Sequence, residues 1–322
     1  MSEYKGIKGF QVQTRTEDPS PTEAQTGDFY YNSTTGQFKT INTGGAPIGT
    51  WSSGGSLGTA RYNAARGTAG TQTAAIASGG AAPAKNNVEQ YNGSAWSEIT
   101  EINTARSRMA SSATSYNAQI ASGGYTTTTV NNVESWNGSS WSEVNEINTG
   151  RYAFAGAGTA AAGLAFGGDP GALNKNESWN GTSWTEITAL NEGVGGNSGA
   201  GTYTAAFMVY NNQHEQWNGN SWTELAELNT ARTHFASAGT TTSALSFGGE
   251  NPGGSARLAN TEFWDGTSWT EVNDLANVGY FNAGAGTSSS AISFTYDSGS
   301  GAQAGTEEWT AADFQIKSVT TS

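Results

Sequence analysis

A short tryptophan motif recurs along the chain and constrains its fold more than any other feature. Its clearest copy reads Glu-Ser-Trp-Asn-Gly-Ser-Ser-Trp-Ser-Glu-Val, from Glu134 to Val144. Further complete copies occupy 89–99, 177–187, 215–225 and 262–272, and a last copy begins at Trp309 and is completed near the other end of the chain. Every Trp belongs to the motif: Trp51, Trp96, Trp136, Trp141, Trp179, Trp184, Trp217, Trp222, Trp264, Trp269 and Trp309. Self-similarity of this kind predicts one repetitive unit rather than several unrelated domains.

The spacing of the motif predicts the size of each repeat. Its second aromatic position falls at residues 51, 96, 141, 184, 222 and 269, so repeats are 38 to 47 residues long. Each repeat contains four β-like runs, among them a small-residue run such as 111–114 and an apolar run ending in Gly-Gly such as 120–124. The Asn-Gly between the two aromatics is a strong hairpin signal and predicts a tight connection between the last two strands. Buried between neighbouring repeats, each Trp is expected to contribute several kcal/mol, about 3–5 on truncation to Ala.

The order of these landmarks resembles the kelch repeat of β-propellers. In one repeat they are Gly123-Gly124, then Trp136, Trp141 and Arg151, and the resemblance covers residues 51–310. Most repeats carry Trp where kelch repeats usually carry Tyr, although Tyr91 keeps it, and two repeats lack the Gly-Gly pair. The resemblance implies a ring of four-stranded blades.

Counting strands predicts how such a ring closes. Five blades run over about 60–99, 105–144, 150–187, 194–225 and 231–272, and a sixth begins near 279 and stops after its third strand at Trp309. Its missing outer strand is expected to be Trp51 and its neighbours, because a closed ring leaves no open sheet edge. We therefore predict an all-β fold, a six-bladed kelch-like β-propeller over 51–310, closed by the N-terminal strand at Trp51.

The segments outside the repeats divide into three parts. Residues 1–26 are expected to form an extended arm, 27–50 a β-hairpin and linker, and 311–322 a C-terminal tail. Aromatic-rich runs flank the turn signal Asn32-Ser-Thr-Thr-Gly36, which predicts the hairpin. The candidate anchor residues of this region are Phe10, Phe29, Tyr30, Tyr31 and Phe38.

Composition excludes several classes of partner. Charged residues are only 13% of the chain, and the net charge is −13 with no basic stripe, so nucleic acid is not an expected partner. No run approaches the roughly 20 apolar residues of a membrane span, and no apolar run follows Met1, so neither a membrane partner nor a signal peptide is expected. The absence of Cys excludes disulfides and thiolate sites.

A second resemblance concerns the N-terminal region and the composition of the repeats. The segment Lys5–Pro19 is similar to the start of kelch-like structural proteins of marine tailed bacteriophages, and Gly27–Gly36 resembles hairpin modules of phage virion proteins. The Asn-Thr-Ala-Arg and Ala-Gly-Ala-Gly-Thr segments of the repeats are similar too. The resemblance implies a non-enzymatic virion structural protein, a capsid decoration or a tail or fibre component. It would assemble in the bacterial host cytoplasm, locate to the virion and contact other virion proteins through residues 1–50.

Strand parity predicts which face would bind a ligand. Successive strands of a blade alternate in direction. The loops that join strands two and three therefore lie on the same face of the ring as the loops that join successive blades. The Asn-Gly turns lie on the opposite face. The loops of the first face vary between repeats, and both terminal segments are expected to leave from the other. Host-surface or glycan binding by the variable face is therefore a hypothesis, with candidate residues Tyr125, Asn131, Asp169, Asn174, Glu250 and Arg257.

Catalysis is weighed against this hypothesis. A propeller hydrolase or lyase acting on polysaccharide needs unique carboxylates facing one bond, but the acidic residues after each second Trp recur once per blade, at Glu98, Glu143, Glu186, Glu224 and Glu271. A copper radical oxidase site is excluded, because the chain has no Cys and only His214 and His234. We predict no catalytic residues and no cofactor. A virion-associated polysaccharide enzyme and a kelch protein-interaction module stay as alternatives.

The recurring arginines and the metal-binding residues leave further alternatives. Four arginines also recur once per blade, and they either pair with a Glu of the same or next blade or form a central ring that binds an anion: Arg61, Arg106, Arg151 and Arg232. His214 has no metal-ligating partner nearby in sequence. Asp169 and Glu250 could supply oxygen ligands to Ca²⁺, but no fixed spacing of carboxylates supports such a site. We therefore predict no metal site.

Overall fold

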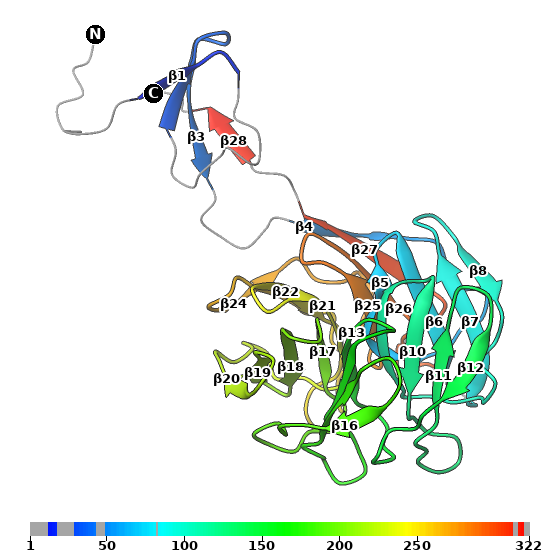
Figure 1. Cartoon of the computed structure of the whole chain (residues 1–322). Coiled ribbons are helices and arrows are strands. Elements are labelled where there is room, and N and C mark those ends of the chain that lie inside the picture. Colours follow the sequence, from blue (N-terminus) through cyan, green and yellow to red (C-terminus); the bar gives the residue numbers. More distant parts are fainter. Residues whose placement is uncertain (1–11, 18–28, 43–48, 82, 312–314, 319–322) are drawn as a thin grey trace. The chain divides into compact units, whose positions relative to one another are not determined.

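The structure, a computed structural model, describes residues 12–17, 29–42, 49–81, 83–311 and 315–318 of the 322-residue chain. All regular elements in these ranges are β-strands, and no helix occurs among them, which confirms the all-β prediction. The chain divides into two compact units (Figure 1). The smaller unit joins both ends of the chain, Met1–Ala46 and Ala312–Ser322, and the larger unit is Pro47–Ala311.

The smaller unit contains a four-stranded sheet in the order β1-β2-β3-β28. Its strands are β1 (Gln13–Arg15), β2 (Phe29–Asn32), β3 (Gln37–Asn42) and β28 (Gln315–Ser318). The expected hairpin is β2 with β3, and the Asn32 side chain stabilises its turn by accepting hydrogen bonds from the N–H groups of Thr34 and Thr35 at 3.1 and 3.0 Å. The strands within the expected arm and tail are additions: β1 pairs in parallel with β2, and β28 pairs antiparallel with β3. Three- and four-residue strands without alternation gave no sequence signal.

The larger unit consists of antiparallel four-strand groups, and all but the last follow the chain order. The first two groups are β5 (Arg66–Thr71), β6 (Ala74–Gly80), β7 (Lys85–Tyr91), β8 (Trp96–Ile99), and β9 (Ala110–Ser115), β10 (Ala118–Ser122), β11 (Val133–Trp136), β12 (Trp141–Val144). The parallel pairing of β5 with β9 joins them into one eight-stranded sheet.

The other groups are separate four-stranded sheets. Two of them are β13 (Ala155–Gly158), β14 (Gly163–Phe166), β15 (Asn176–Trp179), β16 (Trp184–Glu186), and β17 (Ser198–Gly201), β18 (Ala206–Tyr210), β19 (Gln213–Trp217), β20 (Trp222–Glu224). The next is β21 (Ala236–Thr240), β22 (Ser243–Phe247), β23 (Thr261–Trp264), β24 (Trp269–Val272). The last is β25 (Ala283–Gly286), β26 (Ser290–Phe294), β27 (Thr306–Ala311), β4 (Gly49–Ser53).

The last sheet combines strands from the two ends of the repeat region. Strand β27 pairs antiparallel with β4, and Trp309 lies directly opposite Trp51. The N-terminal strand therefore supplies the fourth strand of the last group, as strand counting predicted. Gly49 and Ala311 are paired at the end of this ladder, so both chain segments that lead to the smaller unit leave the larger unit at one place.

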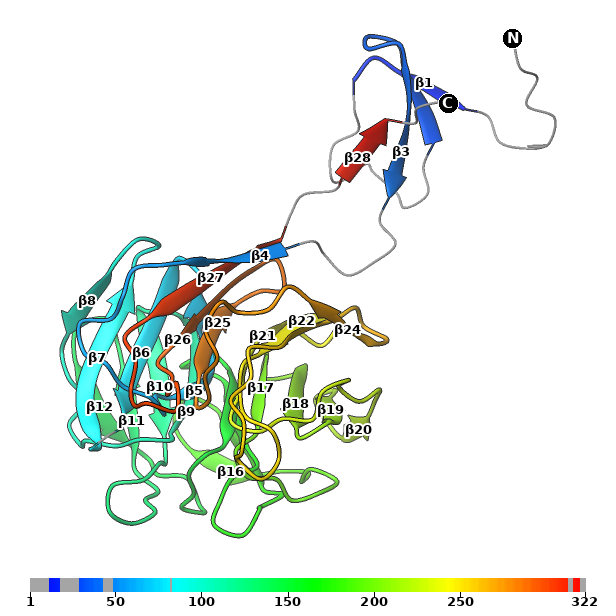
Figure 2. The same ribbon diagram turned by 180° about the vertical axis from the view of Figure 1, so that it is seen from behind.

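Small residues form the first strand of each group because these strands crowd together. Figures 1 and 2 show β5, β13, β17, β21 and β25 toward the middle of the larger unit, with β8, β12, β20 and β24 at its rim. The crowding is closest at Gly67 of β5, where an added Cβ would lie 2.1 Å from the carbonyl oxygen of Gly156 in β13. Only glycine permits such an approach of two backbones.

The aromatic pairs of the repeated motif lie directly opposite each other on the last two strands of their group. Trp136 faces Trp141, for example, with ring centroids 5.4 Å apart. The loop between them has four residues, not a two-residue turn, and the Asn137 side chain accepts hydrogen bonds from the N–H groups of Ser139 and Ser140. The Asn of the motif thus stabilises the loop through its side chain, while Gly138 adopts a φ of 92°.

Each aromatic pair packs against the preceding group of strands. Trp179 and Trp184 share a core cluster with Ile120 and Phe154, for instance, and Trp217 and Trp222 pack with Phe166. The order is cyclic, because Tyr91 and Trp96 of the first group pack with Ile292 and Phe294 of the last. The core is therefore a series of clusters between neighbouring groups.

A ring of backbone hydrogen bonds links the groups. Each group contributes one residue, which lies shortly before its first strand and has a positive φ between 54° and 81°. These six residues are Asn63, Arg108, Ala153, Gly196, His234 and Phe281. Each N–H donates to the carbonyl oxygen of the ring member in the preceding group, at 2.6 to 3.2 Å. The Asn63 N–H donates to the Phe281 carbonyl, so the ring of bonds is closed.

Candidate functional site

The recurring arginines are structural. Arg106 is fully buried, and its Nη2 donates to Glu134 Oε1 at 2.8 Å, while its Nη1 donates to the carbonyls of Gly123 and Asn132. The other pairs of this kind are Arg61–Glu89, Arg151–Glu177 and Arg232–Glu262, all within one repeat. The alternative in which these four arginines form an anion-binding ring is wrong, because each is buried against its own carboxylate.

The glutamates of these pairs belong to the Glu-x-Trp part of the motif. Besides Arg106, Glu134 accepts hydrogen bonds from the backbone N–H groups of Asn103 and Thr104 at 2.7 and 3.3 Å. The glutamates that follow the second Trp are different, because all of them are exposed: Glu98, Glu143, Glu186, Glu224 and Glu271. The repeat therefore uses one glutamate to hold the connection between groups and leaves the other in solvent.

Three of the candidate ligand residues occupy equivalent positions. Tyr125, Asp169 and Glu250 each follow a Gly-Gly pair and form an isolated antiparallel bridge to the residue after the arginine position. The bridge of Tyr152 with Asp169 shows the pattern, with backbone hydrogen bonds of 3.0 and 2.8 Å in the two directions. The bridge partner in each case directly precedes a member of the hydrogen-bonded ring. The backbones of Tyr125, Asp169 and Glu250 therefore lie beside that ring.

Two other candidates lie elsewhere. The Asn131 side-chain amide donates to Glu146 Oε2 at 2.7 Å, and its carbonyl accepts from the Ile147 N–H. Asn174 is exposed, and its carbonyl accepts from the Leu190 N–H at 2.9 Å. Both hold the connection that follows the fourth strand of their group, so the structure does not bring them to the ring.

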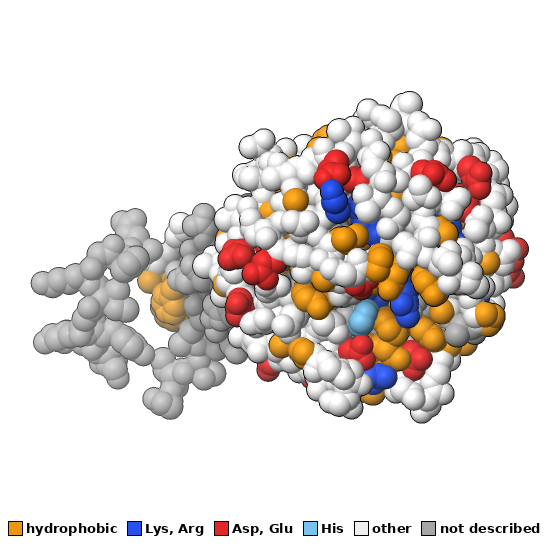
Figure 3. All heavy atoms as spheres, turned by 90° about the horizontal axis from the view of Figure 1, so that it is seen from below, with side chains coloured by type: hydrophobic (Ala, Val, Ile, Leu, Met, Phe, Trp, Pro, Cys, Tyr) orange, Lys and Arg blue, Asp and Glu red, His pale blue; other side chains and the backbone are white. Residues whose placement is uncertain are grey.

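A basic–aromatic cluster surrounds part of the ring. We define it by its titratable members Arg66, Arg108, His234, Glu250 and Arg257, and by the aromatic residues Tyr125, Tyr152, Tyr280 and Phe281. The guanidinium carbons of Arg66 and Arg108 lie 5.4 and 5.6 Å from the centroid of the same ring, that of Phe281. Figure 3 shows basic and hydrophobic side chains and a histidine gathered on one face of the molecule.

Arg108 is half-buried and lies among aromatic rings. Its guanidinium carbon is 5.4 Å from the Tyr152 centroid and 6.0 Å from that of Tyr125, and the two tyrosine rings contact each other edge to face at 5.3 Å. Cation–π contacts of this kind stabilise a guanidinium without neutralising its charge. Tyr125 thus belongs to the cluster because its ring contacts Arg108.

Arg66 is the most deeply buried charge of the cluster, with 2% of its surface exposed. Its Nη2 donates to Asn63 Oδ1 at 2.8 Å, whereas Nε and Nη1 have no hydrogen-bond partner in the described part of the chain. Burial first, and then the like charge of Arg108, lower the pKa of Arg66 to about 9, so the group stays charged at pH 7.

Glu250 already has two partners. Arg257 Nη1 donates to Glu250 Oε2 at 2.7 Å, and His234 Nδ1 lies 2.9 Å from Glu250 Oε1. Burial, and then the charge of Arg66, lower the pKa of His234 despite its hydrogen bond to Glu250, so the ring is neutral at pH 7 and donates its Nδ1–H. The Arg257 guanidinium also stacks on Tyr280, 3.6 Å from the ring centroid. This side of the cluster is a network of satisfied charges.

Sequence reasoning missed Arg66, Arg108 and His234, although a signal for them exists. The repeated arginines occur at one position per repeat, whereas Arg66, Arg108 and Arg257 fall outside that position. Where Arg66 begins a first strand, the other groups have Ala or Ser. Charged residues at positions that do not recur between repeats therefore indicate the cluster better than charged residues at recurring positions.

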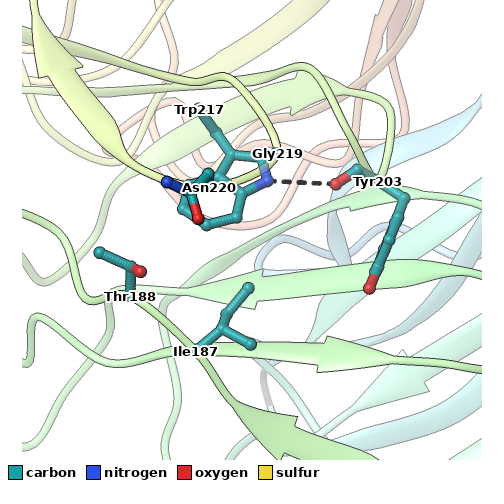
Figure 4. Close-up of a pocket in the computed structure, with 6 residues that line it drawn as sticks. All are labelled: Ile187, Thr188, Tyr203, Trp217, Gly219 and Asn220. Atoms are coloured by element: carbon teal, nitrogen blue, oxygen red, sulfur yellow. Dashed lines mark hydrogen bonds between the residues drawn. The ribbon is translucent and has the colours of Figure 1, made fainter.

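A pocket of about 260 Å³ lies away from the cluster (Figure 4). It is lined by Ile187, Thr188, Tyr203, Trp217, Gly219 and Asn220, and the Trp217 Nε1–H donates to the Tyr203 carbonyl at 3.2 Å. Its lining comes from the end of β19 and the turn that follows, from the turn after β17 and from the segment after β16. None of the candidate ligand residues lines this pocket.

His214 is a core residue. Its ring packs edge to face on Trp264 and Trp269, with centroids 4.5 and 5.4 Å away. His214 Nδ1 lies 3.2 Å from Trp269 Nε1 and 3.3 Å from the Ala226 carbonyl oxygen. Burial lowers the pKa of His214 to about 4.

The candidate anchor residues differ in exposure. Tyr30 is buried within the smaller unit, whereas Phe29 and Phe38 are 43% and 47% exposed and stack on each other at 5.5 Å. Tyr31 packs on Phe38 with centroids 5.1 Å apart. Phe10 lies outside the described residues. The hairpin therefore presents an exposed aromatic patch formed by Phe29 and Phe38.

Neither a metal site nor a membrane-spanning helix occurs among the described residues. Among them no group of three or more His, Cys, Asp or Glu side chains is placed to hold a metal ion, and Asp169 and Glu250 do not form one. No helix in the same ranges is long and apolar enough to cross a membrane. No protein-family model matches the chain, and no curated protein matches its sequence.

Proposed function

We propose that the larger unit is a six-bladed kelch-like β-propeller and that the protein is a non-enzymatic structural component of a bacteriophage virion. The closed ring of backbone hydrogen bonds supports the proposed number of blades, since it takes one residue from each four-strand group. The pairing of β27 with β4 supports closure by the N-terminal strand. The kelch-like landmarks and the phage-like N-terminal segment support the family.

The smaller unit is the proposed attachment to other virion proteins. Both ends of the chain contribute strands to its one sheet, so a single module is available for docking. The exposed aromatic patch of Phe29 and Phe38 is suited to pack against a partner. The protein would then be a capsid decoration or a tail or fibre component, located on the virion after assembly in the host cytoplasm.

The proposed role of the larger unit is to bind a glycan of the host surface. The observation that carries this role is the convergence of Arg66, Arg108 and Arg257, which the repeat does not require, with tyrosines at the hydrogen-bonded ring. Aromatic rings and guanidinium groups are typical of sites that recognise sugars and their substituents. Glu250 supports binding rather than acid–base catalysis, because Arg257 and His234 already hold its carboxylate.

Two measurements test this proposal. A density map of intact virions should show the protein on the particle with the smaller unit at the point of attachment, and its absence from purified virions would refute the structural role. Excess full-length protein, added to host cells before infection, should reduce phage adsorption. Unchanged adsorption, together with no signal on a glycan array, would refute the receptor-binding role.

A further inference from the structure

Arg66 has a buried positive charge that no carboxylate of the described residues pairs with directly. Each recurring arginine pairs with a glutamate and leaves only its Nε without a hydrogen bond. Arg66 leaves both Nε and Nη1 without one, and its hydrogen-bond acceptor is Asn63 Oδ1. Burying an unpaired charge costs several kcal/mol, so such a group usually has a partner. The uncompensated charge of Arg66 therefore gives its surroundings a positive potential that favours an anion nearby.

Arg108 strengthens this indication, since it brings a second positive charge to the same place. It forms no ion pair within the described ranges, and both guanidinium groups lie within 5.6 Å of the Phe281 ring centroid. Like charges in a partly buried site repel each other, and the charge of Arg108 disfavours the protonated form of Arg66. Two guanidinium groups without carboxylate partners near one ring are stabilised by an anion bound close to them.

The neighbouring acidic groups do not neutralise the pair. Glu250 is the one carboxylate whose charge favours protonated Arg66, and it already binds Arg257 and His234. Asp297 accepts hydrogen bonds from the N–H groups of Gly299 and Gly301, at a position equivalent to Glu250. These carboxylates repel a dianion more than a monoanion, so the site favours a ligand with a single negative charge.

We propose that Arg108 binds the carboxylate of an acidic saccharide, that the nearby buried charge of Arg66 strengthens this binding electrostatically, and that Tyr125 and Tyr152 pack against the sugar ring. A guanidinium presents parallel N–H donors that match the two oxygens of a carboxylate. The two tyrosines are half-buried beside Arg108, so their rings supply the apolar surface on which a sugar packs. This inference rests on the proposed glycan-binding role and names its ligand class.

The test measures binding of the full-length protein by calorimetry. The probes are trisaccharides of galacturonate, glucuronate and mannuronate and a sialylated trisaccharide, each compared with its neutral methyl ester. We expect at least one acid to bind, its ester to bind at least tenfold more weakly, and the affinity to fall as salt rises. Inorganic phosphate and sulfate are tested in parallel.

Variants locate the site. Arg108→Gln should weaken binding of the acid at least tenfold, as should Arg66→Gln, and Arg66→Lys should retain part of it. The matched control is Lys175→Gln, which removes one positive charge at an exposed pair with Glu186 and should change affinity less than twofold. Because Arg66 is buried, near-ultraviolet circular dichroism checks the fold of its variants, and the half-buried Arg108 provides the decisive comparison if Arg66→Gln unfolds.

Several results would overturn the inference. Equal binding of acid and ester, or full affinity in Arg108→Gln, would do so while leaving a neutral host glycan in place as the proposed ligand. Binding of phosphate or sulfate without any saccharide would reveal an inorganic anion site only and would also overturn it. Failure of every charged and neutral glycan would remove the receptor-binding role as well.

Discussion

Trp51 and Trp309 lie directly opposite each other on neighbouring strands, although they come from the two ends of the repeat region. Their ring centroids are 5.6 Å apart, and Trp51 also contacts Phe247 edge to face at 4.9 Å. The Trp51 Nε1–H donates to Thr261 Oγ1 at 3.1 Å, which connects it to the preceding sheet. One side chain therefore links strand β4 both to β27 of its own sheet and to the preceding sheet.

Replacing Trp51 should destabilise the larger unit. Trp51→Ala removes an aromatic side chain from the interface between β4, β27 and β22, and we expect the free energy of unfolding to fall by about 3 kcal/mol. Urea denaturation followed by tryptophan fluorescence measures this change. The control is Thr50→Ala at the neighbouring exposed position, expected to change stability by less than about 0.5 kcal/mol. Equal stability of the two variants would show that β4 does not hold the ring together.

Replacing a buried glutamate of the motif should cost more stability where an arginine is paired with it. Glu134→Gln leaves Arg106 buried without its carboxylate, and we expect a loss of about 3–5 kcal/mol. The natural comparison is Glu215, whose repeat has Val194 in place of the arginine, and burial raises the pKa of Glu215. Glu215→Gln removes a charge that burial disfavours, so it should cost at least about 2 kcal/mol less. Similar losses for both variants would contradict the structural role assigned to the Arg106–Glu134 pair.

Close packing in the middle of the larger unit should make Gly67 irreplaceable. Gly67→Ala would place a Cβ 2.1 Å from the Gly156 carbonyl oxygen, and backbone atoms cannot move aside as a side chain can. We expect loss of folded protein or a destabilisation above about 4 kcal/mol. Gly171→Ala is the matched control, because Gly171 also has a positive φ, of 88°, but an added Cβ meets nothing within 4 Å. It should cost only the conformational strain, about 1 kcal/mol.

His214 should make stability depend on pH in mildly acidic solution. Its pKa is lowered to about 4 in the folded protein, so the unfolded chain binds this proton more readily. Stability is therefore complete above the unfolded pKa of about 6.5 and falls as the pH decreases toward 4, by up to about 3 kcal/mol from this group. Comparing urea denaturation of the parent and His214→Phe between pH 7 and pH 4 measures the contribution. A parallel decline of both proteins would mean that His214 is not responsible.

Much of the fold followed from residue types at fixed spacing. The aromatic pairs, the Asn-Gly loops and the small-residue runs each impose a local structure, so strand number and order could be predicted for the repeats, including the use of Trp51 to complete the last group. The short strands β1 and β28 could not, because their pairing depends on partners that are distant in sequence. The Asn-Gly loop also proved longer than a two-residue turn, since the Asn side chain takes the place of a backbone acceptor.

The candidate site was predicted only in part. Variable loops identified Tyr125, Glu250 and Arg257, which the structure brings into the basic–aromatic cluster, and Asp169 at an equivalent position. They also suggested Asn131 and Asn174, whose groups hold the connections between strands instead. Arg66 and Arg108 were missed because they lie next to the repeated segments rather than in the variable loops.

The all-β class and the repeating unit follow from the amino-acid sequence, because periodic aromatic and glycine positions act locally on strands and turns. The sequence also favoured a structural role for the recurring arginines and glutamates, since a residue that recurs in the repeats does not single out one repeat as a functional site. Which charges are paired and which are not depends on the three-dimensional packing. Arg61 and Arg66 are five positions apart, yet the first lies against Glu89 and the second beside Arg108. Whether a charge is neutralised depends on what packs around it, and that is set by contacts between residues far apart in the chain.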